Sequence, residues 1–289
     1  MEKTILVIGA TGTLGESVAR SLKEDGFRVR IMARDRDKTR KMFNEFFEIV
    51  VGDVTDTNSL EESLEGCFGV HINLNPPETE QLGAENVASI ASKKGIGRIT
   101  YISGTNAFDE NSWFPTTKYK LEAEKAIRES GVPYTFFCPT CSMESLSQFI
   151  KGGRAAVFGK QPNPYHWFAT DDLARMVSSS YGIEEAANKK FFIHGPEPIL
   201  AHEAVMRYCT VFHPEIKKIT TIPYWLASIM ATITRNEKMK FGYQLLAFFE
   251  KIGEGGDPTE ANRILGSPKI TLDEWLEKRK NKLDKTTVG

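Results

Sequence analysis

The sequence has no excess of charge of either sign, because 37 lysine and arginine residues stand against 38 aspartate and glutamate residues, for a net charge of −1. A chain without surplus positive charge lacks the field that holds a nucleic-acid backbone or an anionic membrane surface. We therefore expect neither nucleic acid nor membrane among its partners.

Long apolar runs and cysteines are also scarce. The most apolar stretch, residues 224–234, is shorter than the about 20 residues that a bilayer crossing needs and is expected to be a buried helix. The apolar run at residues 5–8 is too short for a signal peptide. Without a signal peptide, four cysteines among 289 residues are typical of reduced thiols rather than of a disulfide framework. These absences predict a cytoplasmic protein.

What the first half does contain is a regular alternation of β-branched apolar runs with helical stretches. This rhythm is typical of βαβ units and predicts an α/β protein with a parallel sheet. The expected strands are residues 4–8, 28–33, 47–51, 69–73, 99–102 and 134–138, and the expected helices are 16–24, 59–64, 81–94 and 118–129.

After residue 150 the rhythm changes, because paired glycines and prolines mark loops. We expect a first domain at residues 1–150, to which a helix and a strand within 170–195 return. Residues 196–289 are expected to form a C-terminal cap, with the loop 151–169 contributing. The helices expected in the cap are residues 204–209, 225–233, 242–250 and 272–282.

Three glycines follow one another at three-residue intervals where the first strand turns into a helix. Such a turn cradles pyrophosphate, because the first glycine permits the tight turn, the second clears a path to the backbone, and the third lets the helix pack on the sheet. An ordinary tight turn is the alternative, and the missing Gly-Lys-Ser/Thr ending argues against a nucleoside triphosphatase. The predicted phosphate-binding residues are Gly9, Thr11, Gly12, Thr13, Leu14 and Gly15.

The end of the second strand distinguishes the two nicotinamide cofactors, because an acidic residue there accepts the ribose 2′-hydroxyl whereas an arginine pairs with a 2′-phosphate. Arg34 follows that strand directly, and Asp35 and Arg36 come next. Arg34 favours NADP(H), Asp35 leaves NAD(H) possible, and Arg36 has solvated surface charge as its alternative. Asp53, after the third strand, is expected near the adenine edge or else as a turn or helix cap.

An ordered set of motifs extends beyond the glycine turn. It comprises residues 9–15, 52–53, 73–77, 101–104, 120–127, 130–135 and 170–174, with 261–263 and 275–276 similar as well. This set resembles the atypical short-chain dehydrogenase/reductase superfamily and, within it, the NmrA-like branch that includes quinone-reductase-like proteins. The resemblance implies a doubly wound parallel-sheet Rossmann fold that binds NAD(P), with a smaller, mainly helical C-terminal substrate region.

Members of that superfamily use a serine, a tyrosine and a lysine four residues after the tyrosine to donate a proton while hydride moves. The resemblance assigns these positions to Ser103, Thr116 and Lys120, so a threonine occupies the tyrosine position. Its hydroxyl is far less acidic than a phenol, whose pKa is about 10, and cannot replace it as general acid. This departure argues against alcohol oxidation and nucleotide-sugar epimerisation. Lys120 is expected to hold the nicotinamide ribose and, in a reductase, to act catalytically as a proton relay. The alternative is a solvent-facing helix lysine.

Ligands of parallel sheets bind outside the carboxyl ends of the strands, so the residues just past the fourth and sixth strands are expected to flank the nicotinamide. Residues 73–77 would form one wall and residues 139–140 the other. The further cofactor-binding residues expected on these grounds are Asn73, Asn75, Pro76, Ser103, Lys120, Pro139 and Thr140.

Two weaker signals remain. His166, in the loop before the helix at 171–181, is a candidate acid for an acceptor oxygen, and the alternative is a packed or surface histidine. Cys138 and Cys141 have C-x-x-C spacing, but buried thiols are favoured over a redox pair or zinc ligands. We expect no metal site.

These features together predict a reductase that prefers NADP(H), with NAD(H) possible, and passes hydride to a small carbonyl or quinone-like acceptor without the usual tyrosine. A small-molecule acceptor is the expected partner, and the oligomeric state, monomer or dimer, is left open. The alternative from another class is a non-catalytic NADP(H)-sensing regulator. A nucleotide-sugar epimerase is a third candidate, although it needs the missing phenol.

Overall fold

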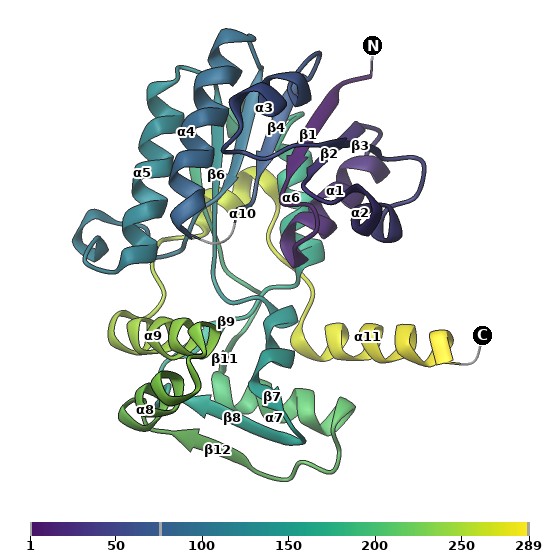
Figure 1. Cartoon of the computed structure of the whole chain (residues 1–289). Coiled ribbons are helices and arrows are strands. Elements are labelled where there is room, and N and C mark those ends of the chain that lie inside the picture. The colour runs from purple at the N-terminus through teal and green to yellow at the C-terminus, as the bar shows by residue number, and fades with distance from the viewer. Residues whose placement is uncertain (1, 75–76, 288–289) are drawn as a thin grey trace. The chain divides into compact units, whose positions relative to one another are not determined.

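The computed structural model describes residues 2–74 and 77–287. The chain divides into two compact units, each assembled from separate stretches of sequence (Figure 1). Unit 1 comprises residues 1–139, 170–193 and 256–267, and unit 2 comprises residues 140–169, 194–255 and 268–289.

This division differs from the expected domains at two places. Residues 140–150, expected in the first domain, lie in unit 2. Residues 256–267, expected in the C-terminal cap, lie in unit 1. Both differences arise because the chain leaves the first sheet immediately after its sixth strand and returns to the edge of that sheet late in the sequence, which no local pattern indicates.

Unit 1 is built on a seven-stranded sheet whose neighbouring strands all run parallel, in the order β10-β6-β5-β4-β1-β2-β3. The chain starts in the middle at β1, moves outward through β2 and β3, and crosses back to β4. This reversal creates a switch point between β1 and β4, where doubly wound sheets bind ligands. The strands are β1 (Thr4–Ile8), β2 (Arg28–Ala33), β3 (Glu48–Val51), β4 (Gly69–Ile72), β5 (Arg98–Ile102), β6 (Tyr134–Pro139) and β10 (Lys189–Ile193).

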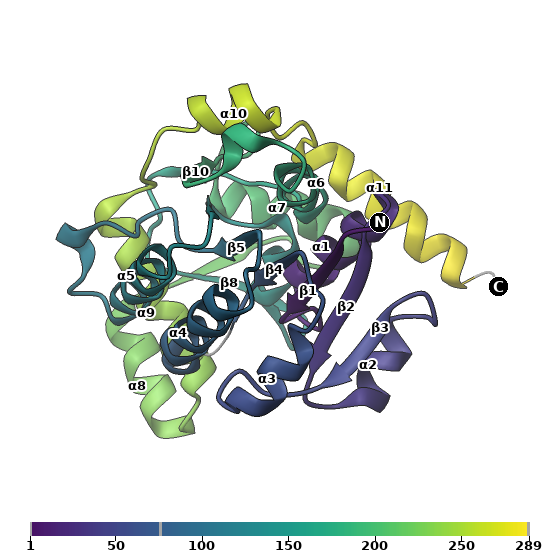
Figure 2. The same ribbon diagram turned by 90° about the horizontal axis from the view of Figure 1, so that it is seen from above.

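Helices cover both faces of this sheet, with α1 and α6 packed together on one face and α4 and α5 packed together on the other (Figure 2). The expected α/β class and parallel sheet are confirmed. The helices of unit 1 are α1 (Thr13–Glu24), α2 (Arg36–Met42), α3 (Thr57–Ser63), α4 (Pro77–Lys93), α5 (Pro115–Glu129), α6 (Thr170–Ser180) and α10 (Thr259–Leu265), with short 3-10 turns at Asp109–Asn111 and Glu184–Ala186.

Two helical layers explain the composition of the strands. Because a sheet covered on both faces hides both sets of side chains, its central strands are continuous apolar runs rather than alternating ones. In β1, Ile5, Leu6 and Val7 are fully buried. The core beneath α4 and α5 joins Leu6 to Val87 and Ile127. Burial of this core holds the carboxyl ends of β1 and β4 in place.

Unit 2 combines helices with two small sheets. A three-stranded sheet runs in the order β12-β8-β7, and β9 pairs antiparallel with β11. Its core includes Tyr165, Trp167 and Leu272, each at most 2% exposed. The elements are η2 (Met143–Phe149), β7 (Ile150–Lys151), β8 (Arg154–Phe158), β9 (Pro164–His166), β11 (Pro198–Leu200), α7 (Ala201–Phe212), β12 (Ile219–Ile222), α8 (Tyr224–Thr234), α9 (Glu237–Ile252) and α11 (Leu272–Thr287).

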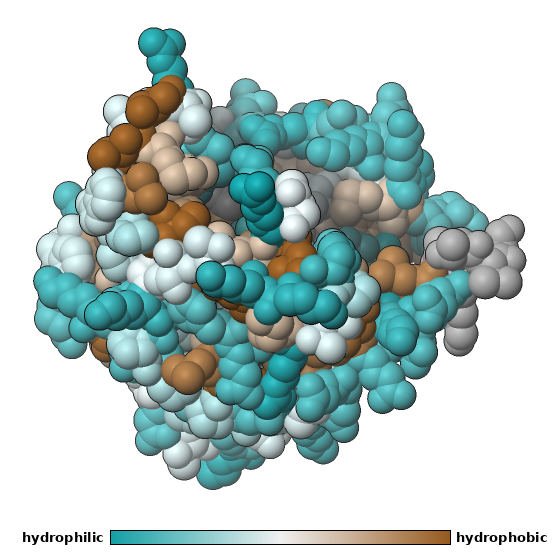
Figure 3. All heavy atoms as spheres, turned by 90° about the horizontal axis from the view of Figure 1, so that it is seen from below, coloured by the Kyte–Doolittle hydropathy of each residue, from teal (hydrophilic) through white to brown (hydrophobic). Residues whose placement is uncertain are grey.

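The expectation that residues 224–234 form a buried helix is half right. The helix forms as α8, but only Ala227 and Ala231 are buried, whereas Trp225 is 66% and Ile233 76% exposed. Figure 3 shows hydrophobic residues in brown among hydrophilic ones on the face of the molecule seen from below. The apolar sequence predicts the helix, but it does not show which face of the helix packs against the rest of the protein. Among the described residues, no helix is both long and apolar enough to span a bilayer.

Candidate functional site

The turn between β1 and α1 is shaped by close contacts that only glycine permits. Gly9 has a φ of +84°, and a Cβ there would lie 1.8 Å from the carbonyl oxygen of Asn73. A Cβ on Gly15 would lie 2.2 Å from the carbonyl oxygen of Gly9. The N–H of Gly12 closes the turn on the carbonyl of Gly9 at 3.1 Å. The first turn of α1 is thereby pressed against the carboxyl ends of β1 and β4.

The N-terminus of α1 has the properties of an anion site. Gly12 is its N-cap and has no side chain to accept a hydrogen bond from the first turn. Thr11, Gly12 and Thr13 are all exposed. Helix N-termini carry unpaired N–H groups and a partial positive charge, which together bind phosphate. The residues predicted from the glycine spacing therefore gather in one turn, in which Thr11 to Thr13 are exposed, Gly9 and Leu14 are half-buried and Gly15 is buried.

The two residues that follow β2, Arg34 and Asp35, differ in their contacts. Asp35 is the N-cap of α2, and its carboxylate accepts a hydrogen bond of 2.9 Å from the N–H of Lys38. Arg34 is exposed. The carboxylate that would take a ribose hydroxyl is therefore engaged in capping, while the guanidinium that would meet a 2′-phosphate lies at the surface.

Asp53 serves as the cap of its own turn. Its carboxylate accepts hydrogen bonds from the N–H and the hydroxyl of Thr55, at 2.9 and 2.8 Å. These two bonds, with a smaller contribution from the nearby Arg34, lower the pKa of the carboxyl. This is the capping alternative stated from the sequence, and the proximity of Asp53 to an adenine stays a prediction.

Asn73 lies directly beside the glycine turn. Its N–H donates to the carbonyl of Ile8 at 3.1 Å, and its own carbonyl is the oxygen that excludes a side chain from Gly9. The backbone after β4 is thus part of the site. Asn75 and Pro76, predicted for the same wall, lie outside the described residues.

Ser103, just past β5, is engaged with a buried carboxylate. Its hydroxyl donates to Glu124 at 2.5 Å, and its N–H donates to the carbonyl of Phe137 at 2.7 Å. Glu124 is fully buried on α5 and also pairs with Lys190 at 2.9 Å and Arg128 at 3.1 Å. Two cations therefore compensate the buried charge of Glu124, which in turn fixes the hydroxyl of Ser103.

Lys120 is held in a second buried cluster. Its ammonium donates to Glu80 at 2.5 Å and to the carbonyl of Ile102 at 2.7 Å. Glu80, in the first turns of α4, also accepts the phenol of Tyr101 at 2.9 Å. The lysine side chain is 15% exposed and the glutamate 2% exposed. The alternative of a solvent-facing lysine is wrong, because Lys120 turns inward to the carboxyl end of β5.

The position expected for tyrosine holds Thr116, and the phenol that lies against the ammonium of Lys120 is that of Tyr101. Thr116 lies one helical turn before Lys120 on α5 and is half-buried. Tyr101 lies under the ammonium, with 5.1 Å from the nitrogen to the ring centroid, but it is fully buried. Burial, followed by the charge of Glu80, raises the pKa of Tyr101 well above its usual value. Such a phenol holds its proton and does not reach solvent.

The two residues expected to form the opposite wall fall in different units. Pro139 ends β6 of unit 1 and pairs with Ile193. Thr140 begins a segment of unit 2, where its hydroxyl donates to the carbonyl of His166. In unit 2, His166 ends β9, and its Nδ1 lies 2.8 Å from a carboxylate oxygen of Glu254. Their roles toward a cofactor or acceptor stay predictions.

The cysteines of the C-x-x-C segment form no disulfide. Cys138 and Cys141 are both free. Burial raises the pKa of each thiol to about 12. Because the thiolate is the reactive form, a raised pKa keeps these thiols protonated and weakly nucleophilic at neutral pH.

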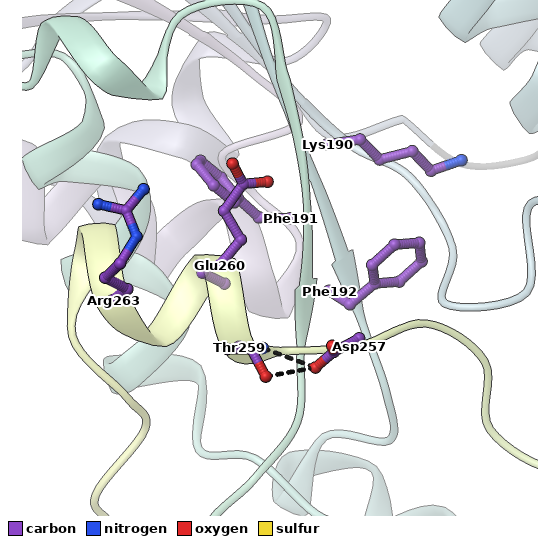
Figure 4. Close-up of a pocket in the computed structure, with 8 residues that line it drawn as sticks. Lys190, Phe191, Phe192, Asp257, Thr259, Glu260 and Arg263 are labelled. Carbon is purple, nitrogen blue, oxygen red and sulfur yellow. Dashed lines mark hydrogen bonds between the residues drawn. The ribbon is translucent and has the colours of Figure 1, made fainter.

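A cavity of about 480 Å³ lies elsewhere in unit 1, between β10 and α10 (Figure 4). The edge strand β10 is separated from β1 by three strands, so this cavity is not at the switch point. Its charged groups already have partners within the protein: Lys190 binds Glu124, Asp257 binds Thr259, and Arg263 binds Glu185. We therefore assign the candidate site to the glycine turn.

Sequence reasoning missed Glu80, Glu124 and Glu254. Each is an unremarkable acidic residue in its local context, and Glu80 and Glu124 lie on helices that also carry exposed charges. Apart from Arg128, four residues after Glu124, the partners named above are 21 to 88 residues away in sequence. Within the chain, no local signal identifies a carboxylate that becomes buried beside such distant groups.

A parallel sheet in this order, with a glycine turn at its switch point, defines the doubly wound Rossmann class. Comparison with known families is more specific, because the model of the NmrA-like family matches residues 1–284. The chain belongs to the NmrA-like family, as the sequence motifs indicated.

The relatives found by sequence differ in their named functions. The chain is 29% identical over 204 residues to the (4-alkanoyl-5-oxo-2,5-dihydrofuran-3-yl)methyl phosphate reductase of Streptomyces griseus, covering 69% of this chain and 70% of the relative. It is 24% identical over 204 residues to the NAD(P)H azoreductase of Xenophilus azovorans, with the same coverage of 69% and 70%. It is also 26% identical over 239 residues to the photosystem II assembly factor Ycf39 of Cyanophora paradoxa, covering 76% and 72%.

Solved structures of the same fold include two reductases. The NADPH-dependent quinone oxidoreductase of Escherichia coli, complexed with NADPH, superposes with a TM-score of 0.78 at 19% identity, covering 95% of this chain and 99% of that one. The triphenylmethane reductase of Citrobacter sp., complexed with NADP(H), gives a TM-score of 0.76 at 18% identity, covering 95% and 99%. At these identities the likeness shows the fold.

The contact of Gly9 with Asn73 gives a prediction about stability. Gly9→Ala is expected to destabilise the protein more than Gly26→Ala, which serves as control because Gly26 has a nearly equal φ of +86° but nothing within 4 Å of its Cβ position. Backbone strain costs about 1–2 kcal/mol at both sites, and the clash at Gly9 adds about 1–3 kcal/mol. Urea unfolding measures the free energy of unfolding of both variants. Equal losses in Gly9→Ala and Gly26→Ala would contradict the close contact between Gly9 and Asn73.

Proposed function

We propose that this chain is an NADPH-dependent reductase that passes hydride to a small carbonyl or quinone-like acceptor. The observation that carries the proposal is the exposed glycine turn at the switch point, with an uncapped helix N-terminus beside it. Family membership supports it, because relatives include reductases and two neighbours of the fold were solved with NADP(H). When bound, NADPH supplies the hydride.

The chain's own residues fit such a cofactor. The exposed turn from Thr11 to Thr13, at the N-terminus of α1, suits a pyrophosphate. Arg34 suits a 2′-phosphate, and the engagement of Asp35 as a helix cap favours NADP(H) over NAD(H). Lys120, held by Glu80, supplies an oriented ammonium for the nicotinamide ribose hydroxyls.

The acceptor class follows from the missing phenol. A carbonyl that must be protonated as hydride arrives needs a general acid. With Thr116 in the tyrosine position and Tyr101 buried, the chain suits acceptors that need little such help, as quinones do. His166 is our candidate for protonating the acceptor oxygen, with Glu254 orienting its imidazole through Nδ1.

A second candidate function is a non-catalytic NADP(H)-sensing regulator. It is favoured by the same pair of observations, the absent phenol and the ammonium of Lys120 already bound to Glu80. A regulator would bind the cofactor without turnover and distinguish NADP+ from NADPH. An epimerase is disfavoured, because threonine occupies position 116 and Tyr101, whose ring lies under the ammonium of Lys120, is inaccessible.

The test of the reductase is NADPH oxidation followed by absorbance against a panel of quinones, enals and ketones. We expect acceptor-dependent oxidation by the wild type and a loss of about tenfold or more in Lys120→Met. Lys118→Met, at an exposed position on the same helix, is the control and should keep full activity.

Removing Lys120 alone takes the cation away from the buried carboxylate of Glu80, which then keeps the hydrogen bond from Tyr101, and the loss is destabilising. The double variant Glu80→Gln/Lys120→Met removes that charge and separates folding from activity. The double variant should have a higher free energy of unfolding than Lys120→Met, but it should oxidise NADPH equally slowly. Full activity in the double variant would refute the role of Lys120, and NADPH binding without any turnover would favour the regulator.

The preference for NADPH rests on Arg34. We expect Arg34→Ala to weaken NADPH binding by about tenfold or more, because a charge-assisted hydrogen bond to phosphate is lost. NADH binding should barely change, and Arg36→Ala should leave both affinities near the wild-type values. Calorimetric titration measures all four cases. Equal losses for NADPH and NADH would refute the 2′-phosphate assignment.

A further inference from the structure

Three metal-ligating side chains of unit 2 come together at one point. They are His166 at the end of β9, His194 in the segment before β11, and Glu254 after α9. One ligand atom of each lies within 4.8 Å of the others. In the part of the chain that the structure describes, no other group of three histidine, cysteine or acidic side chains meets in this way.

The carboxylate of Glu254 is anchored and largely buried. The N–H of His166 donates to its two oxygens at 2.9 and 3.1 Å, and Nδ1 of the same histidine lies 2.8 Å from one of them. The carboxylate side chain is 8% exposed and the imidazole 35% exposed. The carboxylate therefore lies at the buried side of the group, and the imidazole of His166 lies at its accessible side.

The backbone fixes the two histidines side by side. The N–H of Gly195 donates to the carbonyl of His166 at 3.2 Å, and a Cβ on Gly195 would lie 1.7 Å from the carbonyl oxygen of Trp167. Pairing of β9 with β11 continues this register, with His166 opposite Pro198. The imidazoles stack with 5.1 Å between ring centroids and 26° between planes. Rigid placement of this kind is what a preformed metal site requires.

The hydrogen bond between His166 and Glu254 does not explain why His194 lies beside them. Nε2 of His194 lies 3.2 Å from the carbonyl oxygen of Gly255. When Nε2 donates to that carbonyl, the other nitrogen of the ring carries a lone pair. Histidines that bind metals commonly donate their second nitrogen to a backbone carbonyl in this way.

We propose that His166, His194 and Glu254 bind one divalent transition-metal ion of the zinc type, with water in the remaining coordination position. Two imidazoles and one carboxylate suit such ions and leave an open position. Calcium and magnesium are disfavoured, because they prefer sets of oxygen ligands. In the metal-bound form the imidazole of His166 is a ligand and cannot donate a proton. Metal binding by His166 and protonation of the acceptor by His166 therefore exclude one another.

The test uses Co²⁺ as a visible probe of the full chain after treatment with a chelator. We expect one equivalent of Co²⁺ to bind with a ligand-field absorption band, and Zn²⁺ to displace it. His194→Gln and Glu254→Gln should each weaken binding by about tenfold or more. His202→Gln, at a half-buried histidine of α7 in the same unit, should bind as the wild type does.

Unfolding of a variant is separated from loss of a ligand by circular dichroism and by thermal unfolding with and without Zn²⁺. Zn²⁺ should raise the unfolding temperature of the wild type and of His202→Gln, but not that of folded His194→Gln. Absence of the absorption band in the wild type, or equal binding by the wild type and the double variant His194→Gln/Glu254→Gln, would overturn the proposal. None of these measurements uses NADPH, so failure of the reductase proposal leaves them interpretable.

Discussion

The candidate site depends on the contact between the backbone of Gly9 and the carbonyl of Asn73, which brings the turn after β1 against the end of β4. Side chains are excluded at Gly9 and again at Gly15, so α1 starts close to the sheet and its first N–H groups open at the switch point. The sheet order supplies the same switch point independently, because β1 lies between β4 and β2. The close packing of α1 on the sheet and the exposure of its N-terminus therefore have one cause.

Buried carboxylates organise the rest of the predicted machinery. Glu80 holds Lys120, and Glu124 holds Ser103. In unit 2, Glu254 holds His166. A buried carboxylate is costly unless cations or N–H groups compensate it, so each of these acids orders several groups around it. The arrangement fixes polar side chains around Lys120, and with threonine at position 116 it supports our proposal of hydride transfer to reactive acceptors, or of cofactor sensing.

The repeating parts of the fold could be predicted from the sequence, and the long-range parts could not. The strands of the parallel sheet and the glycine turn carry strong local patterns, and the structure has them at the expected places. The short helices at 36–42 and 259–265 and the small strands of unit 2 have seven residues or fewer, so tertiary contacts decide them. The engagement of Asp35 and Lys120 depends on partners that no spacing rule locates. Exposure of Trp225 likewise depends on what the rest of the chain leaves uncovered.

The most direct test of the central claim, that the glycine turn binds the pyrophosphate of NADPH, is a calorimetric titration of NADPH into the wild type and into Gly12→Asp. A side chain at Gly12 would have its nearest neighbour at 3.4 Å, so the variant should fold. The account predicts saturable binding of one NADPH per chain, weakened about tenfold or more by a carboxylate at the helix N-terminus. Equal affinities for the two proteins, or no binding by the wild type, would contradict it.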